Sequence, residues 1–181
     1  MDLTRKTHEM IAKHFKGKEK RLAVDATLGN GHDCEFLLRL NFEQVIAFDV
    51  QAKALIASEK RLETAQLNKA TLIQDGHQNM QHHITAKVDC FMFNFGYLPY
   101  ANKSITTLAE TSVDALQSAL KLLSGDGIIT LLCYPGHEQG EIETKAIQRT
   151  LNDLDNGFLV TEHLAILTSP KAPILYVIEG R

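Results

Sequence analysis

Short apolar runs alternate with stretches of helical periodicity along the chain, and this alternation restricts the fold more than any other feature. The apolar runs, at residues 21–25, 44–49, 70–75, 88–94 and 127–134, have the length and character of buried strands. The stretches between and after them, at about 32–40, 52–66, 104–123 and 138–154, carry apolar side chains at helical spacing. Strands separated by helices predict a mostly parallel sheet with helices on both faces.

The two ends of the chain complete this pattern. Residues 3 to about 16 predict a short amphipathic helix that ends at Gly17. Two closing strands, at about 158–167 and 174–179, flank a turn that contains prolines. No helix fits between these strands, so we expect them to pair antiparallel. The predicted fold is α/β and Rossmann-like, with a mostly parallel seven-stranded sheet and an antiparallel final strand.

Length and composition agree with one domain spanning residues 1–181. Of these 181 residues, 44% are apolar and 23% charged, and a core of this size needs no disulfide or metal. The cysteines, Cys34, Cys90 and Cys133, form no CxxC pair, so we assign no metal. The N-terminus lacks the apolar core of a signal peptide, and no apolar run is long enough for a membrane span. We therefore expect a cytoplasmic protein without membrane contact.

Charge is unevenly distributed along the chain. Residues 1–21 contain seven Lys and Arg residues against three Asp and Glu residues, a formal charge of +4, whereas the other residues carry −7. The N-terminal helical segment, residues 1–20, is therefore basic. Such a segment could dock on a phosphate backbone, or it could simply be a solvated helix surface.

A glycine turn follows the first strand in the sequence Asp-Ala-Thr-Leu-Gly-Asn-Gly, residues 25–31. Gly29 and Gly31 allow a sharp turn and a close approach of a ligand. A dinucleotide fingerprint would have a third glycine where Cys34 stands, which weakens the pyrophosphate interpretation. Asp25 suits a cofactor with a cationic amino-acid end. The alternative is an ordinary tight turn between strand and helix.

Polar residues also follow the second and third strands. Asp49 is placed to accept the hydroxyl protons of a ribose, with Gln51 close enough to help, although Asp49 could instead cap the next helix. Gly76 and His77 follow the third strand, where side chains can meet the edge of an adenine. The chain has eight histidines, and His77 could equally be one with only a structural role.

The fourth and fifth strands end on residues that suit an amine substrate. The Asn94 carbonyl could accept amine hydrogens while the Tyr97 ring packs on a base. Methyl transfer to a neutral amine needs in-line positioning more than a strong base. Tyr134 and His137 would lie beside Asn94 and Tyr97, and His137 could hydrogen-bond the substrate or take up a proton. A structural turn at Asn94 and a helix start at His137 are the alternatives.

Six segments of the chain together resemble a bacterial family labelled rRNA methylase, which includes the MnmM-type aminomethyl-uridine methyltransferases of the tRNA wobble position. These segments are DATLGNGHD, FDVQ, DGHQN, FMFNFGYLP, NKSITT and CYPGHEQGE. They occur in the order of the family, and the resemblance spans about residues 1–179.

The resemblance implies a class I methyltransferase with S-adenosylmethionine as donor. The implied reaction is N-methylation of the 5-aminomethyl group of 2-thiouridine at the tRNA wobble position. By position, the methionine end of the cofactor would be lined by Asp25, Asn30, Gly31 and Asp33, the ribose held by Asp49 and Gln51, and the adenine flanked by Gly76 and His77. The substrate side would comprise Asn94, Tyr97, Lys103, Thr106, Tyr134 and His137.

Other functions remain as alternatives at this point. One is methylation of rRNA, and another is an NAD-dependent Rossmann oxidoreductase, which shares the fold and the ribose carboxylate. The missing third glycine, and the lack of a Tyr-x-x-x-Lys pair for hydride transfer, count against the oxidoreductase. A non-catalytic RNA-binding module would leave the polar strand ends without a purpose. The closing strands also make a homodimer reasonable.

Overall fold

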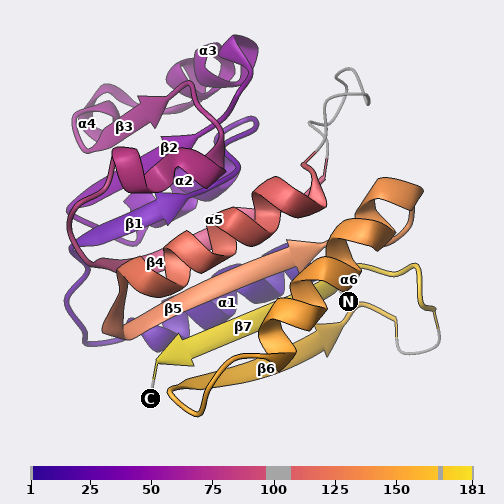
Figure 1. Ribbon diagram of the computed structural model, residues 1–181. Coiled ribbons are helices and arrows are strands. Elements are labelled where there is room, and N and C mark those ends of the chain that lie inside the picture. The colour runs from indigo at the N-terminus through magenta and orange to yellow at the C-terminus, as the bar shows by residue number, and fades with distance from the viewer. Residues whose placement is uncertain (1, 97–106, 167–168, 181) are drawn as a thin grey trace.

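A seven-stranded sheet is the centre of the computed structural model, which describes residues 2–96, 107–166 and 169–180 (Figure 1). The spatial order of the strands is β3-β2-β1-β4-β5-β7-β6. Their bounds are β1 Leu22–Asp25, β2 Gln44–Phe48, β3 Ala70–Ile73, β4 Val88–Asn94, β5 Leu123–Cys133, β6 Phe158–Leu164 and β7 Ile174–Gly180.

The pairing of the strands confirms the predicted topology. Strands β3, β2, β1, β4 and β5 run parallel to one another, and β7 is antiparallel to both β5 and β6. The chain builds outward from β1 to β3 and then crosses to β4 on the other side of β1. This reversal makes β1 and β4 the switch point, beyond whose carboxyl ends ligands bind in sheets of this type.

Helices cover both faces of the sheet (Figure 1). Their bounds are α1 Leu3–His14, α2 His32–Arg39, α3 Ala52–Arg61, α4 Thr64–Leu67, the 3-10 helix η1 His77–His82, α5 Ala109–Leu122 and α6 Glu138–Asn152. Helices α5, α6 and η1 share one core with the sheet, and α1 and α2 share the other. None of the helices in the described ranges is long and apolar enough to cross a bilayer.

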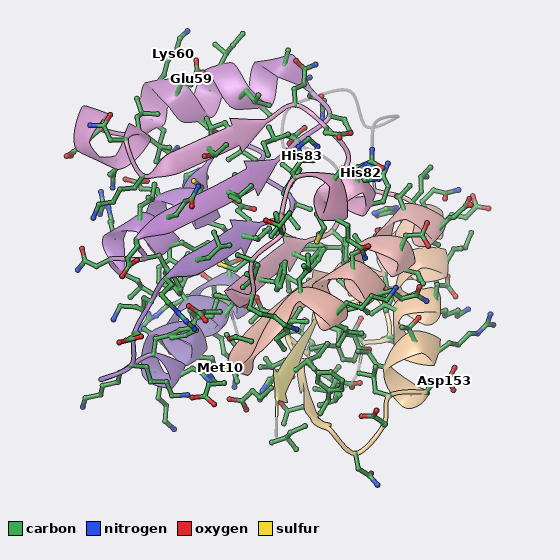
Figure 2. The ribbon with its side chains drawn as sticks, turned by 60° about the vertical axis from the view of Figure 1, so that its left-hand side comes forward. Met10, Glu59, Lys60, His82, His83 and Asp153 are labelled. Carbon is green, nitrogen blue, oxygen red and sulfur yellow. The ribbon has the colours of Figure 1, made fainter. Side chains whose placement is uncertain are left out.

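The alternation of side chains along β4 shows why the predicted strands are apolar throughout. Phe91 and Phe93 point into the core below α5 and α6, whereas Cys90 and Met92 point into the core below α1 and α2. All four side chains are buried, as a strand covered on both faces requires. Exposed charged side chains lie outside these layers, and Figure 2 shows Glu59 and Lys60 pointing away from the sheet.

Several predicted boundaries differ from the structure. The helix expected at 52–66 divides into α3 and α4 because Leu62 is extended, with φ −74° and ψ 135°. The short helix η1 was not predicted. Strand β5 begins at Leu123, although 124–127 was expected to be a turn. Pairing of Leu123 with Val88, followed by a shift of register, keeps this glycine-containing segment extended.

Candidate functional site

The carboxyl ends of β1, β2 and β4 meet at one edge of the sheet, where the sequence placed the site. Asp25 ends β1, Asp49 follows β2, and Asn94 ends β4. The turn after β1 connects these ends. The Gly29 N–H donates to Asp49 Oδ2 (3.0 Å), and the Asn94 N–H donates to Thr27 Oγ1 (2.8 Å). Three strand ends are thereby joined by one turn.

The glycine turn is fixed from outside by α3. Gly29 and Gly31 have positive φ angles of 53° and 79°, which favour glycine. A Cβ atom on Gly31 would lie 2.7 Å from Ser58 Oγ of α3. The carbonyl of Asn30 accepts a hydrogen bond from Arg61 Nε at 2.7 Å. Packing against α3 therefore requires glycine at position 31, whether or not a ligand is bound. The sequence did not reveal this second requirement.

Asp25 is fully buried and only half satisfied. Its Oδ1 accepts a hydrogen bond from the Thr27 N–H (3.1 Å), but its Oδ2 has no hydrogen-bond partner among the described residues. Burial raises the pKa of Asp25 well above its ordinary value and the negative charge of Asp33 raises it further, although the backbone N–H groups of Thr27 and Cys34 oppose the rise. A cationic donor would satisfy the unpaired oxygen and stabilise the charged form. This position suits an ammonium group.

Asp33 lies in the first turn of α2 and is paired with a residue from α1. Its Oδ1 is 2.7 Å from His8 Nε2, and only 8% of Asp33 is exposed. The His8 ring stacks on Phe36, with 3.8 Å between the ring centroids. Sequence reasoning missed His8. No local pattern signals its role, because its partner lies 25 positions away.

Asp49 uses both of its carboxylate oxygens to hold backbone. Oδ2 accepts from the Gly29 N–H, and Oδ1 accepts from the Gln51 N–H at 2.9 Å. Burial raises the pKa of Asp49, although these two N–H groups oppose the rise. Gln51 precedes α3, and its Oε1 atom is buried without a hydrogen-bond partner among the described residues. Asp49 organises the turn between strand and helix, and Gln51 offers an unused acceptor beside it.

His77 lies beneath the glycine turn, next to the core. Its Nδ1 donates to the Ala26 carbonyl at 3.1 Å, and its ring lies 6.1 Å from those of both Phe93 and Phe95. Burial lowers the pKa of His77, so the ring is neutral near pH 7. Because a carbonyl only accepts, the proton is on Nδ1. His77 supports the end of β1, and Gly76 is the N-cap of the helix η1 that begins with His77.

The residues after β4 and β5 lie side by side. A Cβ atom on Gly96 would lie 3.8 Å from the Tyr134 ring. Burial raises the pKa of Tyr134, and a hydrogen bond with the Thr4 side chain opposes the rise. His137 caps α6, with its Nδ1 accepting from the Gly140 N–H at 3.1 Å. The helix start considered for His137 is therefore confirmed.

Asn94 borders a small cavity under α1. The cavity has room for about one water molecule, roughly 10 Å³. Its polar lining residues are Thr4, Thr7, Asp33 and Asn94. Of the remaining predicted substrate residues, Tyr97, Lys103 and Thr106 lie outside the described residues. Within the ranges that the structure describes, no three His, Cys, Asp or Glu side chains cluster closely enough to hold a metal ion.

A buried carboxylate on α6 was also missed. Glu143 is 2% exposed and accepts hydrogen bonds from Ser112 Oγ, at 2.5 Å, and from Thr107. Burial raises its pKa. Thr107 in turn joins Gly96, whose N–H donates to Thr107 Oγ1 at 2.9 Å. An isolated Glu in a charged amphipathic helix gives no signal of this role, because its partners are more than 30 positions away.

Comparisons with known proteins agree with this geometry. The model of the family described as "Putative rRNA methylase" matches residues 45–179. A relative from Arabidopsis thaliana, the chloroplastic tRNA (mnm(5)s(2)U34)-methyltransferase, is 32% identical over 165 residues. The match covers 84% of this chain and 60% of the relative, so the chain spans about three fifths of the length of that protein.

Two solved structures are similar over nearly their whole length. A putative rRNA-methylase from Clostridium thermocellum is 38% identical with a TM-score of 0.92, and the match covers 98% of this chain and 97% of that one. A putative methyltransferase from Streptococcus mutans, solved in complex with SAH, is 32% identical with a TM-score of 0.85, and coverage is 96% and 97%. These similarities confirm the predicted class I methyltransferase fold. Since the family model matches most of the chain, the protein belongs to the rRNA methylase family.

Proposed function

We propose that the protein is an S-adenosylmethionine-dependent RNA methyltransferase that methylates the 5-aminomethyl group of 2-thiouridine at the tRNA wobble position. The observation that carries this proposal is the buried, unpaired Oδ2 atom of Asp25 at the switch point of the sheet. The structural relative from Streptococcus mutans contains SAH, and the curated relative from Arabidopsis thaliana is named for tRNA wobble uridine. Both relatives support the proposed chemistry.

The residues present fit this cofactor. Asp25 Oδ2 would accept from the ammonium of its amino-acid end, and Gln51 Oε1 is a buried acceptor suited to a hydroxyl or amino group of its adenosine part. The glycine turn lies between the two. When bound, the cofactor supplies a methyl group on a positively charged sulfur. Residues on the other side of the turn would bring the amine to it.

Asn94 is the residue proposed to position the amine. Its backbone N–H is fixed by Thr27, so the side chain projects from a rigid strand end. The side-chain carbonyl would accept a hydrogen from the neutral amine and direct the nitrogen lone pair toward the methyl group. Tyr97 would pack on the base. His137, near the end of β5, has its Nδ1 occupied by the Gly140 N–H, so its Nε2–H would donate a hydrogen bond to the substrate, and the proton of the product amine would pass to water.

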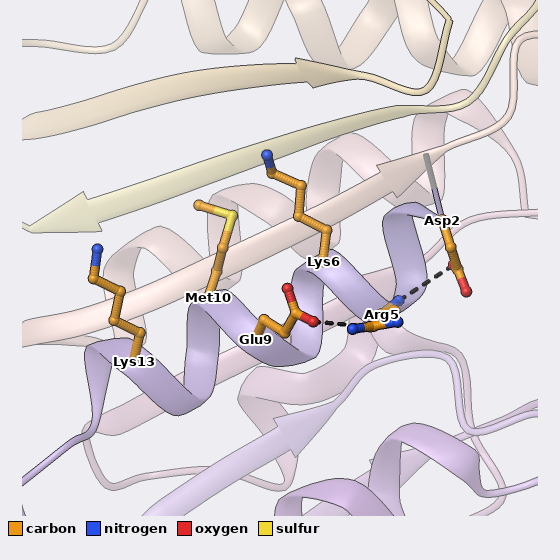
Figure 3. A pocket seen from close by; sticks show the side chains of 6 residues that line it. All are labelled: Asp2, Arg5, Lys6, Glu9, Met10 and Lys13. Atoms are coloured by element: carbon orange, nitrogen blue, oxygen red, sulfur yellow. Dashed lines mark hydrogen bonds and ion pairs between the residues drawn. The ribbon is translucent and has the colours of Figure 1, made fainter.

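Charge on α1 supports an RNA substrate. An open groove of about 480 Å³ runs along the outer side of this helix, where Figure 3 shows Lys6, Met10 and Lys13 in one row. Arg5 pairs with Glu9 at 2.8 Å, which offsets part of the positive charge. The two lysines would contact phosphates, and Lys103 and Thr106 would add substrate contacts. rRNA has the same phosphate backbone and remains the alternative substrate.

Titration with S-adenosylmethionine and, in parallel, NADH tests the cofactor part of the proposal. We expect micromolar binding of S-adenosylmethionine that is lost in Asp25→Asn, and no binding of NADH. Methylation of tRNA that carries the 5-aminomethyl group is then measured by mass spectrometry of its nucleosides, with rRNA as the competing substrate. Binding of NADH alone would identify an oxidoreductase, and methylation of rRNA alone would reassign the substrate.

Assembly and location complete the proposal. Strand β6 is at the edge of the sheet and pairs with β7 alone among the described strands. We propose a homodimer, and sedimentation at several protein concentrations would test it. Since the proposed substrate is tRNA, we propose that the protein acts in the cytoplasm or in the compartment where that tRNA is matured. Microscopy of the tagged protein would test the location.

A further inference from the structure

Helix α1 is attached to the rest of the molecule by two histidine–carboxylate pairs of equal length. His8 Nε2 lies 2.7 Å from Asp33 Oδ1, and His14 Nδ1 lies 2.7 Å from Glu179 Oε1. The pairs differ in their surroundings. His14 also meets the Asp126 carbonyl at 2.7 Å, near the beginning of β5 and therefore at the edge of the sheet opposite the site. The first pair lies at the site itself.

The pair at the site is held rigidly. The His8 ring is stacked on Phe36 with an interplanar angle of 2°, which fixes the plane in which Nε2 meets Asp33. Thr4 and Thr7, from the same helix, line the small cavity beside Asp33 and Asn94. The first two turns of α1 therefore lie over the space between the beginning of α2 and the end of β4.

Asp33 borders this space and Asp25 ends the adjacent strand β1, and of these two carboxylates only Asp33 has a side-chain hydrogen bond among the described residues. Asp33 is the charged neighbour with the largest influence on Asp25. His8 holds Asp33, whereas Asp25 Oδ2 has no hydrogen-bond partner among the described residues. A single cationic group between them could donate hydrogen bonds to both carboxylates. Asp25 would offer its unpaired oxygen, and Asp33 would already be held in place by His8.

We infer that α1 is part of the cofactor site, with His8 as a positioning residue that holds Asp33 toward the ammonium group of the amino-acid end of S-adenosylmethionine. This inference rests on the proposed function. His8 contacts the carboxylate and not the ligand, so its effect is confined to ligands that have an amino-acid end. The adenosine part would be held by the turn after β2, whose residues are not among the partners of His8.

Two ligands separate this role from a purely structural one. S-adenosylhomocysteine has the adenosine part and the amino-acid end, whereas 5′-methylthioadenosine has the adenosine part and a thioether but no amino-acid end. In His8→Ala, we expect the dissociation constant of S-adenosylhomocysteine to rise about tenfold, the effect of one charge-assisted hydrogen bond. That of 5′-methylthioadenosine should change less than about twofold. His8→Gln, which can present a donor near the position of Nε2, should restore part of the selectivity.

His14→Ala is the matched control, because it removes the pair of equal length at the other end of the same helix. We expect it to lower the melting temperature without changing the ratio of the two dissociation constants. Equal loss of both ligands in His8→Ala, or an unchanged ratio, would overturn the inference and leave His8 as an anchor of the helix. If the unmodified protein binds neither ligand, the proposed function itself fails.

Discussion

The two sides of the site are built differently. On the cofactor side, Asp25 and Asp49 each accept a hydrogen bond from the N–H group two residues further along the chain. On the substrate side, Asn94 is fixed by Thr27, which is 67 positions away, and Tyr134 meets Thr4 near the other end of the chain. The carboxylates of the cofactor side are oriented first by their own turns, to which α1 and α3 add distant contacts, whereas the substrate side depends on distant segments alone, so mutations on the two sides should have separable effects.

The largest effect is expected from Asp25→Asn. The amide keeps an oxygen for the Thr27 N–H but removes the buried negative charge opposite the ligand ammonium. Leaving a buried charge unpaired costs about 3–5 kcal/mol, so binding of S-adenosylmethionine should weaken about 1,000-fold. The melting temperature should not fall, because the raised pKa shows that the charged form is disfavoured in the fold. Calorimetric titration and thermal unfolding measure the two quantities; a large loss of stability would contradict the assigned role.

Asn94→Ala should separate the substrate side from the cofactor side. Only the side chain is removed, so the hydrogen bond from its backbone N–H to Thr27 remains. We expect kcat for methylation to fall about 100-fold, since misplacement of a reacting group by about 1 Å costs that much. The dissociation constant of S-adenosylmethionine should stay within about twofold. A parallel loss of cofactor binding would show that the two sides are not independent.

Asp49→Asn tests the local organisation of the turn. Both oxygens accept backbone hydrogen bonds, and the substituted amide nitrogen cannot accept one, so one of the two N–H groups loses its partner. We expect the cofactor to bind about tenfold more weakly and the free energy of unfolding to fall by about 1 kcal/mol. Titration and chemical denaturation test this. Asp89→Asn serves as a control, since Asp89 also accepts a backbone N–H, that of Arg21 at 2.9 Å, but lies near the beginning of β4 and contacts neither Gly29 nor Gln51.

Glu143→Gln should give the smallest change, on the substrate side. Burial raises the pKa of Glu143 above its unfolded value, so its favourable contribution is complete at low pH and is lost as the pH rises through the folded pKa. The amide can still accept from Ser112 but has no charge to bury. We expect the variant to melt about 2–4 °C higher at pH 8, as for a gain near 1 kcal/mol, and to match the parent protein near pH 4. An equal shift at both pH values would contradict this explanation.

The sequence predicted most of the architecture because its signals are local and repeated. Apolar runs flanked by helical stretches identified seven strands, and the short connection between the last two gave their antiparallel pairing. The same logic located Asp25, Asp49 and Asn94 at strand ends. Boundaries were less accurate where tertiary contacts overrule local preference. Residues 124–127 have the composition of a turn but lie within β5, between Leu123, which pairs with Val88, and Ile128, which pairs with both β4 and β7.

The composition of the site is divided in the same way. The sequence by itself determined which parallel strands have carboxylates or an amide at their ends. A strand is recognised from a run of consecutive residues, and the polar residue that ends it comes next in the same run. Only the tertiary structure decided that α1 lies over these ends and that His8 meets Asp33. It also decided that Glu143 joins Ser112 and Thr107. These contacts join residues 25 to 36 positions apart, and no local pattern specifies which helix face will be buried against which strand end.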